Sequence, residues 1–152
     1  MTLRETAIDD LEEHHLADLV ERGVPEIRHI DYKRQLPRPG ESASKEFLAD
    51  VCSFANAGGG DLVYGVEEEG GVPKAVTGIP MPDPDREILR LENLIRDGID
   101  PRPTGFASRS IPVANGNHVL VIRVPRSFNR PTPWITATAS AITRATPLAS
   151  TL

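Results

Sequence analysis

Three carboxylates and a lysine stand in the sequence where they could act together on a phosphate group. Asp31 and Lys33 are separated by one residue, so they would share one face of a strand. Glu26 lies five residues before Asp31, so the two converge only if Glu26 lies in a turn before that strand. Glu67 or Glu68 follows a later strand and would complete an oxygen-rich cluster of the kind that suits Mg²⁺ or Mn²⁺.

This cluster predicts a hydrolytic chemistry and also has a plainer interpretation. Glu26, Asp31 and Glu67 would hold the metal and orient water, and Lys33 would neutralise charge on a scissile phosphate. In the plainer interpretation, Glu26 is a turn acid, Glu67 belongs to a solvated hairpin tip, and the strand between them has a solvated face. Surface carboxylates are common, so both interpretations stay open.

Basic side chains gather in two stretches of an otherwise acidic chain. The formal net charge of -5 argues against a protein that coats nucleic acid through its overall charge, so a phosphate-binding face must be local. The residues predicted to bind DNA or RNA are Arg28, Lys33, Arg34, Arg38, Lys45, Arg123, Arg126 and Arg130. If the two stretches do not meet in the fold, they form a scattered solvated surface instead.

The elements that must position these groups follow from apolar periodicity. Helices are expected over residues 8–22, from an N-cap at Ser42 to 56, and over 83–98. Strands are expected over 28–34, 62–66, 72–79, 104–113 and 118–124. The glycines at 58–60 follow a helix, which indicates a helix end and a tight entry to a buried strand, and does not support an ATP-binding loop.

This order predicts an α+β fold: a single domain in which a mixed, mainly antiparallel sheet packs against helices. We expect a helical segment at residues 1–23, the domain at 24–131, and a low-complexity end at 132–152. That end is almost wholly Thr, Ala, Ser and Pro, which predicts either a disordered extension or the product of a frameshift.

The composition of the chain indicates the cellular compartment in which the protein is expected. Cys52 is the only cysteine, so no disulfide forms within the chain and a reducing, cytoplasmic location is expected. No run of about 18 apolar residues occurs, so we expect neither a membrane span nor a membrane partner.

Three sequence pieces, taken in order, resemble the Schlafen/AlbA-like domain family of DNA-binding proteins. They are Glu26 ahead of Asp31-Tyr32-Lys33, Phe54-Ala55-Asn56 with Gly59-Gly60, and Gly65-Val66-Glu67. The resemblance covers about residues 11–131, although the family usually carries Glu-Phe-Lys where this chain has Asp31-Tyr32-Lys33. In animal Schlafen proteins similar acids form a ribonuclease site, which implies that role for Glu26, Asp31 and Glu67.

Three functions therefore compete. The first is a nucleic-acid-binding module of a regulatory or defence protein, which needs no cofactor. The second is a metal-dependent endoribonuclease that uses Mg²⁺ or Mn²⁺. The third is an interaction domain that forms a homo-oligomer through exposed strand edges and has no catalytic activity.

Overall fold

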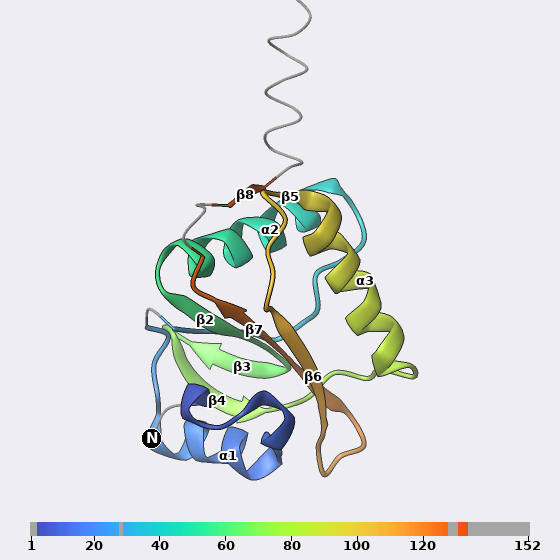
Figure 1. Cartoon of the computed structure of the whole chain (residues 1–152). Helices are drawn as coiled ribbons and strands as arrows, with labels where there is room; N and C mark the ends of the chain where they lie inside the picture. Colours follow the sequence, from blue (N-terminus) through green and yellow to red (C-terminus); the bar gives the residue numbers. More distant parts are fainter. Residues whose placement is uncertain (1–2, 28, 128–130, 134–152) are drawn as a thin grey trace, which may run out of the picture.

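The computed structural model describes residues 3–27, 29–127 and 131–133 (Figure 1). Arg28, Arg130 and the expected disordered or frameshifted end beyond Pro133 lie outside these described residues. No helix in the described ranges is both long and apolar enough to span a membrane.

A four-stranded mixed sheet in the order β1-β2-β7-β6 forms the centre of the molecule. β1 (Ile30–Lys33) runs parallel to β2 (Gly59–Tyr64), whereas β7 (His118–Pro125) pairs antiparallel with both β2 and β6 (Ala107–Pro112). This arrangement confirms the predicted α+β class with a mixed, mainly antiparallel sheet.

The remaining strands form two separate two-stranded sheets, in contrast to the single sheet that the pattern predicts. β3 (Val66–Glu69) pairs with β4 (Val72–Val76), and β5 (Ile99–Asp100) pairs with β8 (Thr132–Pro133). Gly65 separates β2 from β3 at a φ of 108°, so the chain leaves the central sheet before the hairpin begins. Pro73 lies inside β4 where the register shifts, which is one of the few strand positions that proline tolerates.

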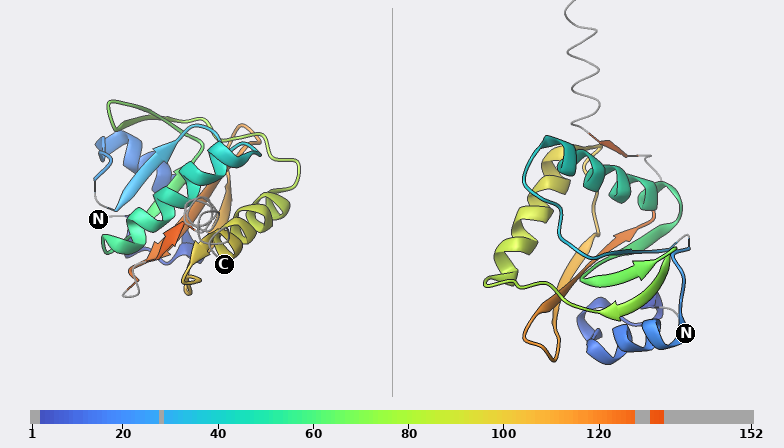
Figure 2. Two further views of the ribbon diagram at one scale, coloured as in Figure 1. Left: turned by 90° about the horizontal axis from the view of Figure 1, so that it is seen from above. Right: turned by 180° about the vertical axis from the view of Figure 1, so that it is seen from behind.

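Helices and the hairpin cover the two faces of the central sheet, and each face has its own core (Figures 1 and 2). α2 (Glu41–Asn56) and α3 (Pro84–Gly98) cover one face, where Phe47, Leu62 and Ile122 are buried. α1 (Glu13–Arg22) and the β3–β4 hairpin cover the other, together with the short 3-10 turns η1 (Leu3–Glu5) and η2 (Ile8–Asp10).

Two expected helix starts are wrong. The predicted helix over 8–22 is broken, because Leu11 is extended and buried, and α1 begins only at Glu13 behind a capping box. The N-cap of α2 is Gly40 and not Ser42, and no side chain caps that helix. The capping box of α1 is formed by Glu12 and His15 instead of the usual Ser or Thr with Glu or Gln, and α2 has no side-chain cap, so neither start carries the usual sequence signal.

Candidate functional site

β1 turns Asp31 and Lys33 toward the side of the sheet that α2 covers. Asp31 pairs with Leu62 and Lys33 with Tyr64, and both partners belong to the core beneath α2. Lys33 Nζ lies 3.4 Å from Asp31 Oδ2 and 3.5 Å from Asp50 Oδ2 on α2. The lysine therefore links the strand to the helix through two carboxylates.

Glu26 approaches Asp31 from the turn before β1. The sequence analysis predicted that the two carboxylates could converge only from such a turn. Its Oε1 accepts the backbone N–H of Tyr32 at 2.9 Å. Burial raises the pKa of Glu26, the Tyr32 N–H opposes that rise, and a hydrogen bond and the charge of Asp31 add to it. Glu26 and Asp31 are therefore neighbours that share an electrostatic environment.

Glu26, Asp31 and Asp50 line one cavity of about 310 Å³. It is here named the acidic cavity and is lined by Glu26, Ile27, Ile30, Asp31, Asp50, Ser53, Phe54 and Ala57. Glu67 does not line it; the hairpin carboxylate that contributes to the raised pKa of Glu26 is that of Glu68. Within the described ranges, no three His, Cys, Asp or Glu side chains form a group that could hold a metal ion.

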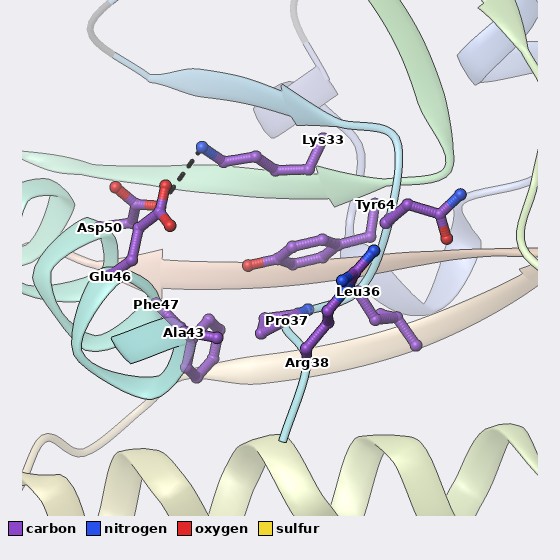
Figure 3. Close-up of a pocket in the computed structure, with 10 residues that line it drawn as sticks. Lys33, Leu36, Pro37, Arg38, Ala43, Glu46, Phe47, Asp50 and Tyr64 are labelled. Atoms are coloured by element: carbon purple, nitrogen blue, oxygen red, sulfur yellow. Dashed lines mark ion pairs between the residues drawn. The ribbon is translucent and has the colours of Figure 1, made fainter. Parts of the chain in front are cut away.

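A second cavity, of about 250 Å³, lies on the other side of Asp50 and is here named the tyrosine cavity (Figure 3). It is lined by Lys33, Gln35, Leu36, Pro37, Arg38, Ala43, Glu46, Phe47, Asp50 and Tyr64. Asp50 lines both cavities, and burial raises the pKa of its carboxyl group although Lys33 opposes the shift. Burial alone would lower the pKa of Lys33, but the charges of Asp50 and Asp31 outweigh it and raise that pKa.

The predicted basic residues are not all on one face. Arg34 and Arg38 are exposed in the segment after β1, and Arg38 borders the tyrosine cavity. Lys45, one turn into α2, pairs with Glu41 at 3.2 Å. Arg126 is exposed just after β7, in a different part of the chain.

Arg123 has a structural role. Its guanidinium donates two hydrogen bonds to the fully buried carboxylate of Asp61, at 2.9 and 3.1 Å, across the β2–β7 pair. It also donates to the carbonyl oxygens of Leu3 and Thr6. We therefore leave Arg123 out of the proposed nucleic-acid surface.

Sequence reasoning missed two members of the site, Asp50 and Tyr64. Asp50 follows Phe47 by three residues, so on a helix it borders the apolar face instead of lying opposite it. That position could have predicted that Asp50 lies close to the sheet. The sequence around Tyr64 contains no signal for a role in the site, because Tyr64 lies in an apolar run where a buried aromatic ring is expected.

Comparison with known proteins identifies a matching family and a solved structure with a similar fold. The chain matches the Schlafen, AlbA_2 family over residues 26–145, and no curated protein matches it. Among solved structures it resembles the N-terminal domain of a protein described as related to the ATP-dependent DNA helicase RecG, from Nitrosomonas europaea. That match has 26% identity and a TM-score of 0.51, and it covers 72% of each chain.

A second solved structure, the DIP2311 protein from Corynebacterium diphtheriae, matches at 22% identity with a TM-score of 0.46. The match covers 80% of this chain but only 24% of that chain. This chain therefore spans about a quarter of that protein.

Proposed function

Because the chain belongs to the Schlafen, AlbA_2 family, we propose that it is a module that binds nucleic acid, DNA or RNA, beside the carboxyl end of β1. The similarity to a domain of a protein related to a DNA helicase supports the same class of ligand.

The observation that carries the proposal is the pair of exposed arginines after β1. In the described part of the chain, neither Arg34 nor Arg38 forms an ion pair with a carboxylate, whereas Lys33 and Lys45 do. A guanidinium that is not already paired can form bidentate hydrogen bonds with phosphate oxygens. Two such groups on an acidic protein make a local phosphate-binding surface.

Salt-dependent binding tests this proposal. We expect fluorescence anisotropy with labelled DNA and RNA strands to show affinity that falls as salt rises, without added metal. Neutralising Arg34 and Arg38 as Arg34→Gln and Arg38→Gln should reduce the log–log salt slope by about 0.7 to 0.9 for each phosphate that the variant no longer neutralises.

Lys74→Gln is the matched control, because Lys74 is an exposed cation on β4, across the sheet from α2. It changes the net charge by the same amount as either arginine variant. If all three variants weaken binding equally, the effect comes from net charge and the proposed surface is rejected.

A second candidate function, a metal-dependent endoribonuclease, is favoured by the convergence of Glu26 and Asp31 on the acidic cavity. The described residues do not complete a metal site, so we assign no step of a reaction to Mg²⁺ or Mn²⁺. A bound divalent cation would supply charge stabilisation at a phosphate. The hypothesis that Glu67 is the third acid remains a proposal, and Glu68 is its alternative.

The test of the nuclease is RNA degradation with and without Mg²⁺ or Mn²⁺. We expect Asp31→Asn to abolish metal-dependent cleavage while RNA binding persists, because the amide keeps the shape of the side chain and loses the charge. Comparing Glu67→Gln with Glu68→Gln would identify the third acid. Equal cleavage by Asp31→Asn and the unmodified protein would reject the nuclease.

A further inference from the structure

The hydroxyl of the buried Tyr64 side chain faces the tyrosine cavity. Tyr64 is 2% exposed, and Figure 3 shows its hydroxyl directed toward the side of the cavity where Glu46 and Asp50 lie. No described residue forms a hydrogen bond with this hydroxyl. Burial, with the nearby charges of Asp50 and Asp31, raises the pKa of Tyr64, so the group keeps its proton and can donate a hydrogen bond. A hydroxyl that faces a cavity and has no protein partner is free to donate to water or to a bound ligand.

The charges around the cavity balance. Lys33 and Arg38 are cationic and Glu46 and Asp50 are anionic, so the lining has no formal net charge. Lys33 is already bound to Asp31 and Asp50. A phosphate inside the cavity would meet the two carboxylates, so the lining favours a neutral ligand with both donors and acceptors.

Apart from Gln35 and the Tyr64 hydroxyl, the remaining walls are apolar, and the space is small. Leu36, Pro37, Ala43 and Phe47 provide apolar surface. The volume of about 250 Å³ is below the roughly 300–1,000 Å³ of pockets that hold drug-sized ligands. A single flat heterocycle fits this description better than a whole nucleotide or a peptide segment does.

We propose, building on nucleic-acid binding at the same site, that the tyrosine cavity takes one unpaired nucleobase and prefers bases that carry an exocyclic amino group. The Tyr64 hydroxyl donates to a ring nitrogen or carbonyl oxygen of the base. A carboxylate of Glu46 or Asp50 accepts from the amino group, as carboxylates do from cytosine N4. Arg38, at the rim, lies where the phosphate attached to that base would emerge.

Short fluorescent RNA homopolymers provide the test, with the full chain as the protein. We expect oligocytidine to bind more tightly than oligouridine at the same salt concentration. Tyr64→Phe keeps the ring and removes the donor, so it should lower affinity for oligocytidine about fivefold, the effect of one hydrogen bond. Its melting temperature should not fall, because the hydroxyl has no partner within the protein to lose.

The chain supplies a matched control in its other tyrosine. Tyr32 is equally buried, at 2% exposed, but it lies on the opposite face of the sheet and its hydroxyl donates to the Val24 carbonyl at 2.8 Å. Tyr32→Phe should therefore lower the melting temperature and leave the affinity for oligocytidine unchanged.

Several results would overturn the inference. Salt-sensitive binding with equal affinity for oligocytidine and oligouridine would reject the nucleobase site and leave nucleic-acid binding intact. A Tyr64→Phe variant that binds as well as the unmodified protein would do the same. Failure of the RNA homopolymers alone, with the labelled DNA strands still bound, would reject the nucleobase site for RNA and leave DNA binding intact. Failure of every RNA and DNA strand to bind would reject the proposed function and the nucleobase site together.

Discussion

At the scale of single residues, Glu26 has two interactions that oppose each other. The Tyr32 N–H at 2.9 Å stabilises its charged form, whereas burial and the neighbouring Asp31 favour the protonated form. Because the pKa is raised overall, the folded protein binds this proton more tightly than the unfolded chain does. The stability gained in this way is fully present below the ordinary pKa of 4.5 and is lost as pH rises through the folded pKa.

Glu26→Gln should therefore make the protein slightly more stable near neutral pH. The amide oxygen can still accept from Tyr32, while the repulsion from Asp31 disappears, so the free energy of unfolding should rise by less than about 1 kcal/mol. Urea unfolding at about pH 7 and about pH 4 measures this difference, which should shrink at the lower pH. Glu21→Gln on the exposed surface of α1 is the control. A gain that is larger at the lower pH would contradict the assignment.

The sequence predicted the shared face of Asp31 and Lys33 because alternation along a strand is a local rule. It also predicted that Glu26 must lie in a turn. It could not predict which distant carboxylates approach them, because the distance between Asp50 and Lys33 depends on how α2 lies across the sheet. Glu67 and Glu68 show the same limit: the hairpin charge that raises the pKa of Glu26 is that of Glu68, and the sequence does not reveal the register shift between the two acids.

At the scale of elements, most helices and strands follow from local pattern, and the errors lie at their boundaries. The strand predicted over 62–66 ends at Tyr64, and the one predicted over 72–79 ends at Val76. α3 begins behind Asp83, whose side chain accepts the Arg86 N–H at 3.2 Å, and this start agrees with the predicted one. The unexpected separation of the hairpin from the central sheet depends on Gly65, and a glycine alone does not indicate the direction of a turn.

The start of β2 offers a prediction about close packing. Gly59 has a φ of 90°, and a Cβ atom there would lie 2.7 Å from the Val124 carbonyl oxygen. Gly116 has a φ of 87° and no atom within 4 Å of its Cβ position. Gly116→Ala should cost about 1 kcal/mol, and Gly59→Ala about 3 kcal/mol or more, since its backbone neighbours must also move.

Urea unfolding of the two alanine variants measures the difference, and the nearly identical φ angles make Gly116 a strict control. Equal losses of stability would mean that only the backbone angle matters at Gly59. In that case β2 and β7 would not be held in close approach by the glycine.

At the scale of the whole molecule, Arg123 joins three parts of the chain that are far apart in sequence. It pairs with Asp61 in β2, lies in β7, and donates to carbonyl oxygens of the first described residues. Leu3, Leu11 and Leu16 are buried in the same core, so the expected N-terminal segment packs as part of the domain. The sequence predicted a helical segment there but not its contact with Arg123, because no local signal reveals a partner more than a hundred residues away.

Arg123→Met should destabilise the protein by about 3 kcal/mol, because it leaves the Asp61 carboxylate buried and unpaired. The double variant with Asp61→Leu should recover much of that loss, since neither charge then remains. Arg22→Met, which affects the exposed pair with Asp18, should cost less than about 1 kcal/mol. Chemical denaturation of the three variants gives these values, and equal losses for Arg123→Met and Arg22→Met would contradict the structural role.

The interaction between Glu26 and Tyr32 also bears on self-association through the sheet. β1 is an edge strand, and residues His29 and Lys33 direct their carbonyl groups toward β2, so Ile30 and Tyr32 direct theirs outward. The two outward N–H donors are already engaged, that of Ile30 by the Ile27 carbonyl and that of Tyr32 by Glu26. A second copy that approached this edge could still donate to the Ile30 and Tyr32 carbonyl groups, but its own carbonyl groups would find both N–H donors already bound. A full ladder would therefore form only if these two bonds broke, which disfavours strand addition at β1.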